Sequence, residues 1–527
     1  MKKTLFIAIF ILAIGAPIDL FAQATAKGIV YEDLNRNNKK EANEKGIANV
    51  AVSNGIEVVL TNSRGEYDIA VSDDAIVFVI KPSNYEYPLN TYNQPLFYYI
   101  HKPKGSPDLK YEGTPATGNL PASINFGLYP AQTNNRFKIL VFGDPQPHNR
   151  KQVDFFFRGI VSELENIEGV AFGLSLGDLV NDGLELFHPY KNAVTKIGIP
   201  WHNVMGNHDM NTDVKTDTLS DETFERHFGP ANYAFNHGMV HFIILDDILY
   251  PDPRDGKGYW GGFRSDQLKF IENDLRYVPK DHLIVLALHI PFREDETYDA
   301  FRDEDRTKVF ELLKNFPHTL SLSAHTHLQR QDFFYAKDGW LQKQPHHQYN
   351  VGTTSGDWYR GRLDKNGVPV STMRDGTPKG YAYLHFDKNR YVIDYKVAGK
   401  PFDYQIRVHA PKVVRQAKWS SAAILANFFI GSERDTLFYR IDKGEWKKMH
   451  YYETYDPVYY QQSFEWDFTP ELFEGSRPSY PTQCRHLWYG HLPADLAIGE
   501  HAIEVKALDM FGRTFMQTSS YRIAKTP

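Results

Sequence analysis

Cysteine is almost missing from this chain, since Cys484 is the only one among 527 residues. A single cysteine cannot form a disulfide within the chain, and it cannot supply the thiolates of a Cys-ligated zinc site. An excess of basic residues is also missing, because the net charge is -6. A nucleic-acid partner is therefore not expected. Any metal chemistry must depend on imidazole, carboxylate and amide ligands.

Long apolar runs are missing after the first residues of the chain. Two lysines precede an apolar run over residues 5–16, and small residues allow cleavage after Ala24. This order is typical of a secretory signal peptide over residues 1–24. A membrane anchor is the alternative, but the run is shorter than the roughly 20 residues that span a bilayer, and Pro17 and Asp19 prevent its continuation. We expect an exported protein, periplasmic or extracellular, with no transmembrane segment after signal cleavage.

Three further regions differ in the spacing of their apolar residues. Residues 25–130 contain short strand-like runs separated by turn residues, which predicts an N-terminal β-sandwich domain. Residues 136–400 alternate strand runs with helical spacing, which predicts a parallel sheet with helices on its faces. Residues 401–527 return to alternating runs without a useful helical stretch. The expected fold class is an α/β core flanked by two small all-β domains.

Polar residues follow the strand runs of the middle region at the point where each run ends. In an open α/β sheet, ligands bind at the carboxyl edge because the loops there converge on one crevice. Taken singly, each of these residues would more often be a turn, a helix cap or a satisfied core histidine. Their occurrence together favours one site, and its members are Asp144, Asp178, Asn207, His208, His289, His325 and His327.

This combination of ligands suits two cations that share a carboxylate. A pair of metal ions can clamp both the attacking and the leaving oxygen of a phosphoryl transfer, and Asp178 could bridge them. Imidazole together with carboxylate suits iron, manganese and zinc. In a strand-like His325-Thr326-His327, alternate side chains point the same way, so we expect both imidazoles to face the metals.

Five segments of this region resemble the five motifs of the calcineurin-like metallophosphoesterase family, in the family's order. The stretch Gly499 to Gly512 also resembles the carboxy-terminal β domain of a bacterial branch that carries β domains at both ends. The resemblance implies a four-layer α/β sandwich for the core. The five segments are Gly143-Asp144-Pro145-Gln146, Gly177-Asp178-Leu179-Val180-Asn181-Asp182-Gly183, Gly206-Asn207-His208-Asp209, Leu288-His289 and Ala324-His325-Thr326-His327.

The resemblance also implies a role for each residue. A bridging water or hydroxide would attack phosphorus. His208 would face the leaving group as a general acid or as a transition-state hydrogen bond, oriented by Asp209 or Asp182, with Asn181 pointing toward the site. The first metal would take Asp144, Gln146, Asp178 and His327, and the second would take Asp178 as the bridge with Asn207, His289 and His325.

Two positions depart from the family pattern. Gln146 stands where the family usually has histidine, and an amide oxygen is a harder and weaker ligand than imidazole. We therefore hypothesise that the first site favours manganese, magnesium or iron over zinc. Asn181 stands where some relatives have an aspartate that pairs with the catalytic histidine, so the acid role of His208 has less support than the metal ligands.

Two further segments are candidates for binding. The stretch 352–380 is long and rich in glycine, so we expect it to form part of the wall of the substrate-binding crevice. The alternative is a surface loop without a functional role. In the first region, four residues occupy positions 1, 3, 5 and 12 of an EF-hand-like calcium loop, and the alternative is a polar turn bonded to its own backbone. These four residues are Asp33, Asn35, Asn37 and Glu44.

The expected function is that of an exported binuclear-metal phosphoesterase, acting on a phosphate mono- or diester. The substrate is expected to be a small molecule or a surface glycan or lipid phosphate ester. Two metal ions (Mn, Fe, Mg or Zn) are expected, with calcium as a candidate in the N-terminal domain. A pyrophosphate or nucleotide hydrolase on the same fold is one alternative. A non-catalytic surface-binding protein with a vestigial site is the other, but it should have lost more ligands than one.

Overall fold

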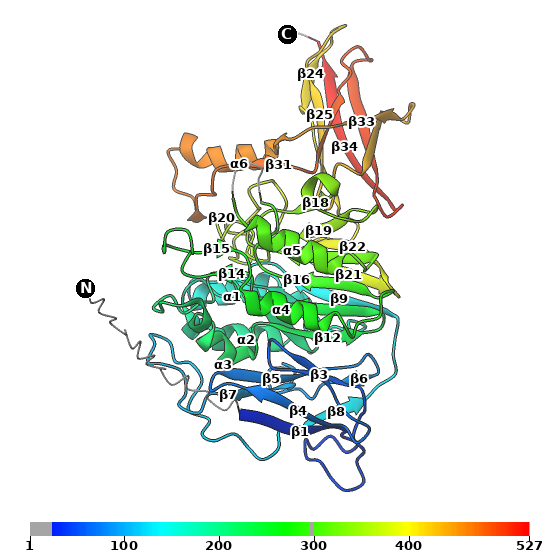
Figure 1. The fold of residues 1–527 in the computed structure, drawn as a ribbon. Coiled ribbons are helices and arrows are strands. Elements are labelled where there is room, and N and C mark those ends of the chain that lie inside the picture. The colour runs from blue at the N-terminus through cyan, green and yellow to red at the C-terminus, as the bar shows by residue number, and fades with distance from the viewer. Residues whose placement is uncertain (1–23, 295–298, 526–527) are drawn as a thin grey trace, which may run out of the picture.

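The computed structural model describes residues 24–294 and 299–525, so the predicted signal peptide lies outside them except for Ala24. In Figure 1 the chain forms three parts that follow one another along the molecule. Blue strands lie at one end, the green α/β layers lie in the middle, and yellow to red strands lie at the other end. This arrangement confirms the predicted fold class, an α/β core with flanking β domains.

The N-terminal part consists of two four-stranded sheets. Alternate residues of its first strand are buried, including Ala26 and Val30, as expected for a strand with one face on a core. One sheet has the order β4(Glu66–Val71), β1(Ala24–Glu32), β8(Phe126–Pro130), β6(Tyr85–Glu86). The other has the order β3(Val58–Leu60), β2(Ala51–Ser53), β5(Ala75–Ile80), β7(Tyr98–His101).

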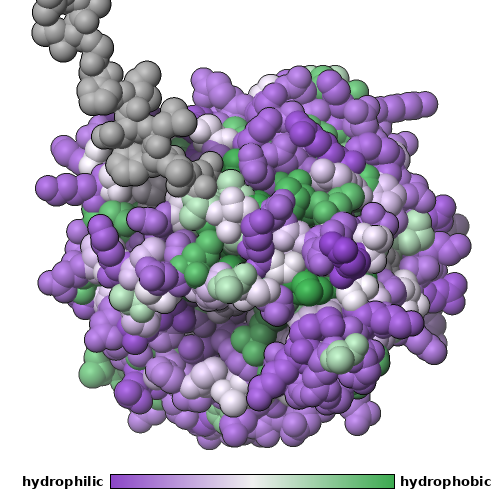
Figure 2. All heavy atoms as spheres, turned by 60° about the horizontal axis from the view of Figure 1, so that its bottom comes forward, coloured by the Kyte–Doolittle hydropathy of each residue, from purple (hydrophilic) through white to green (hydrophobic). Residues whose placement is uncertain are grey.

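The outer face of this part is mainly hydrophilic. In Figure 2, hydrophobic residues form several separate small patches on a mostly hydrophilic surface. Single exposed apolar residues are ordinary on a folded protein, so these patches need no partner to explain them. The more exposed ones in this part of the chain include Leu34, Ile56, Leu60, Leu89 and Leu96.

A buried cation joins the N-terminal part to the core. The Lys102 ammonium lies 2.7 Å from a carboxylate oxygen of Glu222 and 3.0 Å from one of Glu225, both in helix α3(Glu222–Phe228). It also lies 2.9 Å from Asp74. The side chains of Lys102 and Glu222 are only 4% and 1% exposed, so neither charge is well solvated.

Replacing this lysine by an isosteric apolar residue should destabilise the protein. We expect Lys102→Met to cost about 3 kcal/mol or more, because buried carboxylates are left without their cation. Differential scanning calorimetry should show a lower unfolding temperature than for the wild type. Lys104→Met, at an exposed lysine two residues away, is the matched control. Equal melting temperatures for the two variants would contradict the expectation.

Two sheets packed face to face form the middle part. The first has the order β11(Trp201–Val204), β10(Gly173–Leu176), β9(Arg136–Phe142), β21(Gly380–Asp387), β22(Arg390–Val397). Strands β9, β10 and β11 are parallel. Strand β21 pairs antiparallel with β9, so the chain returns to the first sheet after the long 352–380 segment.

The second sheet has mainly parallel neighbours. Its order is β12(Tyr233–His237), β13(Val240–Ile244), β16(Leu283–Ala287), β17(His318–Ser323), β19(His346–Asn350), β18(Arg330–Phe334). Strands β13, β16, β17 and β19 run parallel, and every residue of β13 and β16 is buried. Such strands read as continuous apolar runs because both faces are covered. Phe242 of this sheet contacts Phe386 of the first, with ring centroids 5.8 Å apart.

Helices cover the outer faces of both sheets. Helix α1(Arg150–Gly159) places Phe156 against Phe142 of β9, and α2(Phe187–Thr195) lies beside it. Helix α1 is 10 residues long and ends at Gly159. Helix α5(Asp303–Leu313) packs on the second sheet through Phe310. Helix α4(Ser265–Asp274) contacts the N-terminal part, with Phe270 against Phe78.

The C-terminal part contains two larger sheets and a helix that the sequence analysis missed. One sheet has the order β23(Ile406–His409), β25(Ala423–Phe428), β32(Leu487–His491), β28(His450–Tyr451). The other has the order β24(Val413–Arg415), β34(Thr514–Ala524), β33(Gly499–Leu508), β26(Thr436–Ile441), β27(Lys447–Lys448). Two-stranded pairs complete the fold: β14(Ile248–Leu249) with β15(Trp260–Gly261), β20(Gly361–Arg362) with β30(Gly475–Ser476), and β29(Thr454–Tyr455) with β31(Gln483–Cys484).

The expectation of no useful helix after residue 400 was wrong, because α6(Pro457–Phe468) is a twelve-residue helix. It buries only Tyr459 and Ser463, so it lacks the apolar stripe by which amphipathic helices are recognised. A start signal was present, since the Asp456 carboxylate accepts the backbone N–H of Val458 and Tyr459, and Pro457 stands at the first helical position. In the described part of the chain, no helix is long and apolar enough to span a membrane.

Candidate metal centre

The predicted site residues follow the carboxyl ends of parallel strands in both sheets. Asp144 comes after β9, Asp178 after β10 and Asn207 after β11, all in the first sheet. His289 comes after β16 and His325 after β17, both in the second sheet. Because the sheets pack face to face, their carboxyl edges meet, and the loops of both deliver side chains to one place.

One group of ligands gathers around Asp178. An oxygen of its carboxylate lies 3.3 Å from Nε2 of His289. The same nitrogen lies 3.0 Å from the amide oxygen of Asn207 and 3.2 Å from Nδ1 of His325. Asp178, His289 and His325 each offer one ligand atom, and these atoms lie within 4.8 Å of one another. This spacing suits donors around a single cation.

A second group lies on the other side of Asp178. The Gln146 amide nitrogen donates to Oδ2 of Asp178 over 2.9 Å. Nε2 of His327 lies 3.8 Å from a carboxylate oxygen of Asp144. Asp144 also accepts the backbone N–H of His325, so the two groups share a framework. Asp178 thus stands between a set with Asn207, His289 and His325 and a set with Asp144, Gln146 and His327.

The state of the buried donor atoms fits metal ions. Among the described residues, Oε1 of Gln146 and Nε2 of His327 are buried without a hydrogen-bond partner. Buried polar atoms are nearly always satisfied, so two such atoms at one site fit donors to a metal ion. Two of the site histidines hold Nδ1 against a backbone carbonyl: His289 against that of Leu176 at 2.8 Å, and His327 against that of Gly356 at 3.1 Å. These bonds orient the free nitrogens toward the site.

The backbone at these loops adopts an uncommon conformation. Non-glycine residues with positive φ are uncommon, and they cluster at functional sites where the surrounding structure enforces them. The expectation of a strand-like His325-Thr326-His327 was wrong, because β17 ends at Ser323 and both histidines are left-handed. Their imidazoles reach the site through this turn. The positive-φ members of the site are Asp144, Gln146, Asp178, His325 and His327.

Without metal, the ionisable groups of the site strongly shift one another's pKa values. Burial opposes protonation of His289, but the Asp178 carboxylate outweighs it and raises the His289 pKa to about 10. Burial, reinforced by Asp178, raises the pKa of Asp144 to about 8. The histidine charge more than offsets burial at Asp178 and holds the pKa of that carboxyl below its usual value. Burial lowers the pKa of both His325 and His327 to about 3.

Metal uptake should therefore release protons. At pH 7 the metal-free site holds a proton on His289 and mostly one on Asp144, and both must leave before these groups can bind a cation. We expect about two protons released per chain on full loading, and weaker metal binding as the pH falls. Titration calorimetry of the metal-free protein with Mn²⁺ in buffers of different ionisation enthalpy measures this number. Release of no protons at pH 7 would contradict it.

His208 lies at the exposed edge of the site. Its side chain is 32% exposed, and its Nδ1 lies 2.8 Å from Oδ1 of Asp182. Burial disfavours the imidazolium, but the carboxylates of Asp178 and Asp182 outweigh it and raise the pKa to about 9. The Asn181 amide lies 2.9 Å from Nδ1 of His148 and 3.4 Å from an oxygen of Asp182, and the described residues show no hydrogen bond from it to the His208 imidazole. Among the predicted partners, Asp182 is thus the one beside His208.

Asp209 has a different environment from the one predicted. Its carboxylate is fully buried and accepts the backbone N–H groups of Leu179, Val180 and Gly206 at 2.9 to 3.1 Å. These groups belong to the loops that carry Asp178 and Asn207. Asp209 therefore ties two ligand loops together and does not orient His208. A carboxylate next to a histidine in sequence does not have to contact it.

Other residues support the ligands without having been assigned to the site from the sequence. The Asp247 carboxylate accepts the backbone N–H of His289 over 3.1 Å. The Trp358 ring stacks on the His327 imidazole, with centroids 4.0 Å apart and planes 20° from parallel. The Tyr359 hydroxyl donates to the Pro145 carbonyl. The last two belong to the 352–380 segment, whose length and glycine content were the only signals in the sequence.

The side chains of the candidate calcium loop accept hydrogen bonds from the loop's own backbone. Asp33 accepts the N–H groups of Asn37 and Asn38 at 3.2 and 2.8 Å. Glu44 accepts those of Leu34 and Glu41 at 3.0 and 2.9 Å. The side-chain amides of Asn35 and Asn37 donate to Glu41. These bonds are those of the polar-turn alternative, and calcium binding stays a prediction.

Comparison with protein families matches three segments of the chain. Residues 137–329 match the calcineurin-like phosphoesterase model, and they contain the candidate metal ligands described above. Residues 34–114 match the N terminal of calcineurin-like phosphoesterase, and residues 348–515 match its C terminal. Among curated proteins, none matches the chain.

Solved structures give weaker similarities. Purple acid phosphatase PPD1 from yellow lupin (Lupinus luteus) is 12% identical over 67% of this chain and 69% of its own, with a TM-score of 0.37. A metallophosphoesterase from Sphaerobacter thermophilus is 14% identical over 50% of this chain and 89% of its own, with a TM-score of 0.23. At these TM-scores neither superposes on the chain as a whole. The three matched segments and the order of the motifs show that the chain belongs to the calcineurin-like phosphoesterase family, in the form that carries both N- and C-terminal extension domains.

Proposed function

We propose that the protein hydrolyses a phosphate ester with two metal ions that share Asp178. The observation that carries this proposal is the position of that carboxylate between two sets of donors, one of which contains two orphaned ligand atoms. Metal ions bound there would supply Lewis acidity toward the phosphoryl oxygens and a water of lowered pKa. The first ion would be held by Asp144, Gln146, Asp178 and His327, and the second by Asp178, Asn207, His289 and His325.

The residues of the chain have separate tasks in this proposal. Asp178 places its two oxygens toward different donor sets, which keeps both halves of the site at a fixed separation. The Nδ1 bonds of His289 and His327 to backbone carbonyls hold their Nε2 atoms toward the site. Asp209 and Asp247 fix the loops from behind through backbone N–H groups. A site built in this way is preorganised, so little reorganisation is needed when the substrate binds.

His208 is proposed to hold a proton for the leaving group. Its Nδ1 side faces Asp182, which leaves Nε2 available to a ligand at the exposed edge of the site. The Asp182 carboxylate, 2.8 Å from Nδ1, stabilises the protonated form of the imidazole. This form can therefore hydrogen-bond the departing oxygen and transfer the proton as the ester bond breaks.

We also propose export and a preference for hard metals. Export is supported by the signal-peptide pattern at the start of the sequence. The metal preference is supported by Gln146, whose unpartnered oxygen takes the place of an imidazole at the first site. An amide oxygen suits manganese, magnesium or iron better than zinc.

A substrate and metal screen tests the proposal. Metal-free protein is reloaded with manganese, magnesium, iron or zinc and assayed with phosphate monoesters, diesters, nucleotides and pyrophosphate. We expect hydrolysis of a mono- or diester, and none by His289→Ala. Preferential hydrolysis of pyrophosphate or nucleotides would favour the alternative on the same fold. No hydrolysis with any metal would support a vestigial site, and highest activity with zinc alone would contradict the metal preference.

A further inference from the structure

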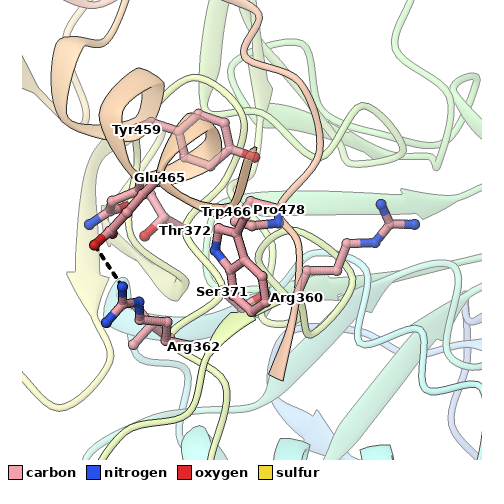
Figure 3. A pocket seen from close by; sticks show the side chains of 11 residues that line it. Arg360, Arg362, Ser371, Thr372, Tyr459, Glu465, Trp466 and Pro478 are labelled. Atoms are coloured by element: carbon pink, nitrogen blue, oxygen red, sulfur yellow. Dashed lines mark hydrogen bonds and ion pairs between the residues drawn. The ribbon is translucent and has the colours of Figure 1, made fainter. Parts of the chain in front are cut away.

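A pocket lies where the 352–380 segment meets helix α6 of the C-terminal part, with a volume of about 210 Å³ (Figure 3). Strand β20 of the segment pairs antiparallel with β30, which comes after α6 in the chain, so the two sides are joined by backbone bonds. Its lining includes Arg360, Arg362, Tyr459, Glu465 and Trp466.

This pocket is a neighbour of the metal centre. Trp358 stacks on the metal ligand His327, whereas Arg360 lines the pocket. The two residues are separated by one position, so their Cα atoms lie within about 7 Å of each other. The turn between them is held by a bond from Arg360 N–H to the Asp357 carbonyl over 2.9 Å. The Tyr459 hydroxyl of α6 donates to the Asp357 carboxylate over 3.2 Å. This bond connects helix α6 to the same turn of the 352–380 segment.

The backbone of this turn is unusual in the same way as the metal loops. Trp358 and Tyr359 are consecutive bulky residues with φ of 49° and 56°. Bulky residues seldom adopt this conformation unless surrounding contacts enforce it, and such strain concentrates at binding sites. Here it turns the chain so that Trp358 faces the metal ligand while Arg360, two residues later, lies at the pocket.

The lining combines an aromatic surface with donors and acceptors of hydrogen bonds. Trp466 is held by an edge contact with Phe473, at 5.1 Å between ring centroids. Arg362 pairs with Glu465 over 2.6 Å, the interaction drawn as a dashed line in Figure 3. Arg360 donates to the Ser479 hydroxyl over 3.2 Å, and the described part of the chain shows no carboxylate partner for it.

These properties select a class of ligand. A wholly apolar group would leave the charged and hydroxyl groups of the wall without partners, which is costly. A sugar ring has hydroxyls that both donate and accept, so it can bond arginine and carboxylate at once. Its C–H face can also pack on an indole ring. A volume of about 210 Å³ accommodates a single ring of this size.

We infer that this pocket binds a sugar ring of the substrate while the phosphoryl group lies at the metal centre. The inference rests on the proposed phosphoesterase function and narrows its substrate to a sugar phosphate. Trp466 supplies the stacking surface, and Arg362 and Glu465 bond the ring hydroxyls. Loss of Trp466 should therefore impair only those esters that carry a ring.

The test compares two esters with primary alkyl leaving groups, glucose 6-phosphate and propyl phosphate. We expect the wild type to favour the sugar phosphate, and Trp466→Ala to lower kcat/KM for it by about tenfold, the size of one lost aromatic contact. Activity on propyl phosphate should stay within about twofold. Trp419→Ala, at a tryptophan of the same part that is 85% exposed, is the matched control.

Equal losses on both esters, or no preference of the wild type for glucose 6-phosphate, would overturn the inference. If the wild type hydrolyses neither these two esters nor any other ester of the substrate screen with any metal, the phosphoesterase proposal fails by itself. In that case the affinity for glucose 6-phosphate, measured by titration calorimetry, still tests whether the pocket binds a sugar ring. Weaker binding by Trp466→Ala than by Trp419→Ala would support it, and equal binding would refute it.

Discussion

Replacing Asp178 with asparagine is expected to lower kcat/KM by about 10³-fold or more, since this carboxylate lies between both donor sets. An amide is neutral and presents one good ligand oxygen in place of two, so one cation should be lost or displaced. The wild type should carry two metal ions per chain after reloading with manganese. The variant should carry one or fewer, measured by inductively coupled plasma mass spectrometry on the gel-filtered protein.

The controls separate loss of metal from loss of fold. Asp154→Asn changes an exposed carboxylate on α1 that pairs with Arg158, and it should keep both metal content and activity. Circular dichroism should show the same spectrum for both variants. Two tightly held ions and near-normal turnover in Asp178→Asn would show that this carboxylate is not the shared ligand. The proposal that the two ions share Asp178 would then have to be abandoned.

Replacing His208 with glutamine is expected to lower kcat by about 10²- to 10³-fold while the metal content stays unchanged. The reason is that this imidazole contacts Asp182 and the exposed edge, whereas the ligand positions belong to other residues. The loss should be largest for alkyl phosphates, whose leaving oxygen needs a proton. It should be much smaller for 4-nitrophenyl phosphate, whose leaving group departs without one. Steady-state rates on both esters measure this difference.

The pH dependence of kcat gives a second test of the role of His208 as an acid. The Asp182 carboxylate helps to raise the pKa of His208 to about 9, and it stabilises the protonated imidazole. Asp182→Asn should therefore move the alkaline limb of kcat to lower pH, because the proton is lost sooner. An unchanged limb, or equal losses on both esters in His208→Gln, would indicate that the imidazole acts by charge or position and not as an acid.

Much of the metal centre could be predicted because its residues are tied to local patterns. A buried parallel strand reads as a short apolar run, and the polar residue after it lies at the carboxyl edge. Asp144, Asp178 and His289 are examples, and each comes within two residues of the end of such a run. The order of these motifs was also sufficient to predict the family and the fold class.

Contacts between distant segments could not be predicted in this way. The sequence placed Asp209 beside His208, but hydrogen bonds from the Asp178 loop and from Gly206 of its own loop draw its carboxylate away from the imidazole. The left-handed turn of His325 and His327 has no signal in residue type, because neither is glycine. Helix α6 lacks an apolar stripe, and its position against the 352–380 segment depends on the packing of the C-terminal part.

The amino-acid sequence by itself determined which strands end in candidate ligands, the charge type of those residues and the family to which the chain belongs. These properties depend on neighbours within a few residues, where side-chain periodicity and turn chemistry act. The tertiary structure decided that Asp178 lies between two donor sets, that Asp182 and not Asp209 contacts His208, and that a pocket adjoins the metal centre. Such relations join segments far apart in the chain, and only the packing of the sheets and of α6 sets the distances between them.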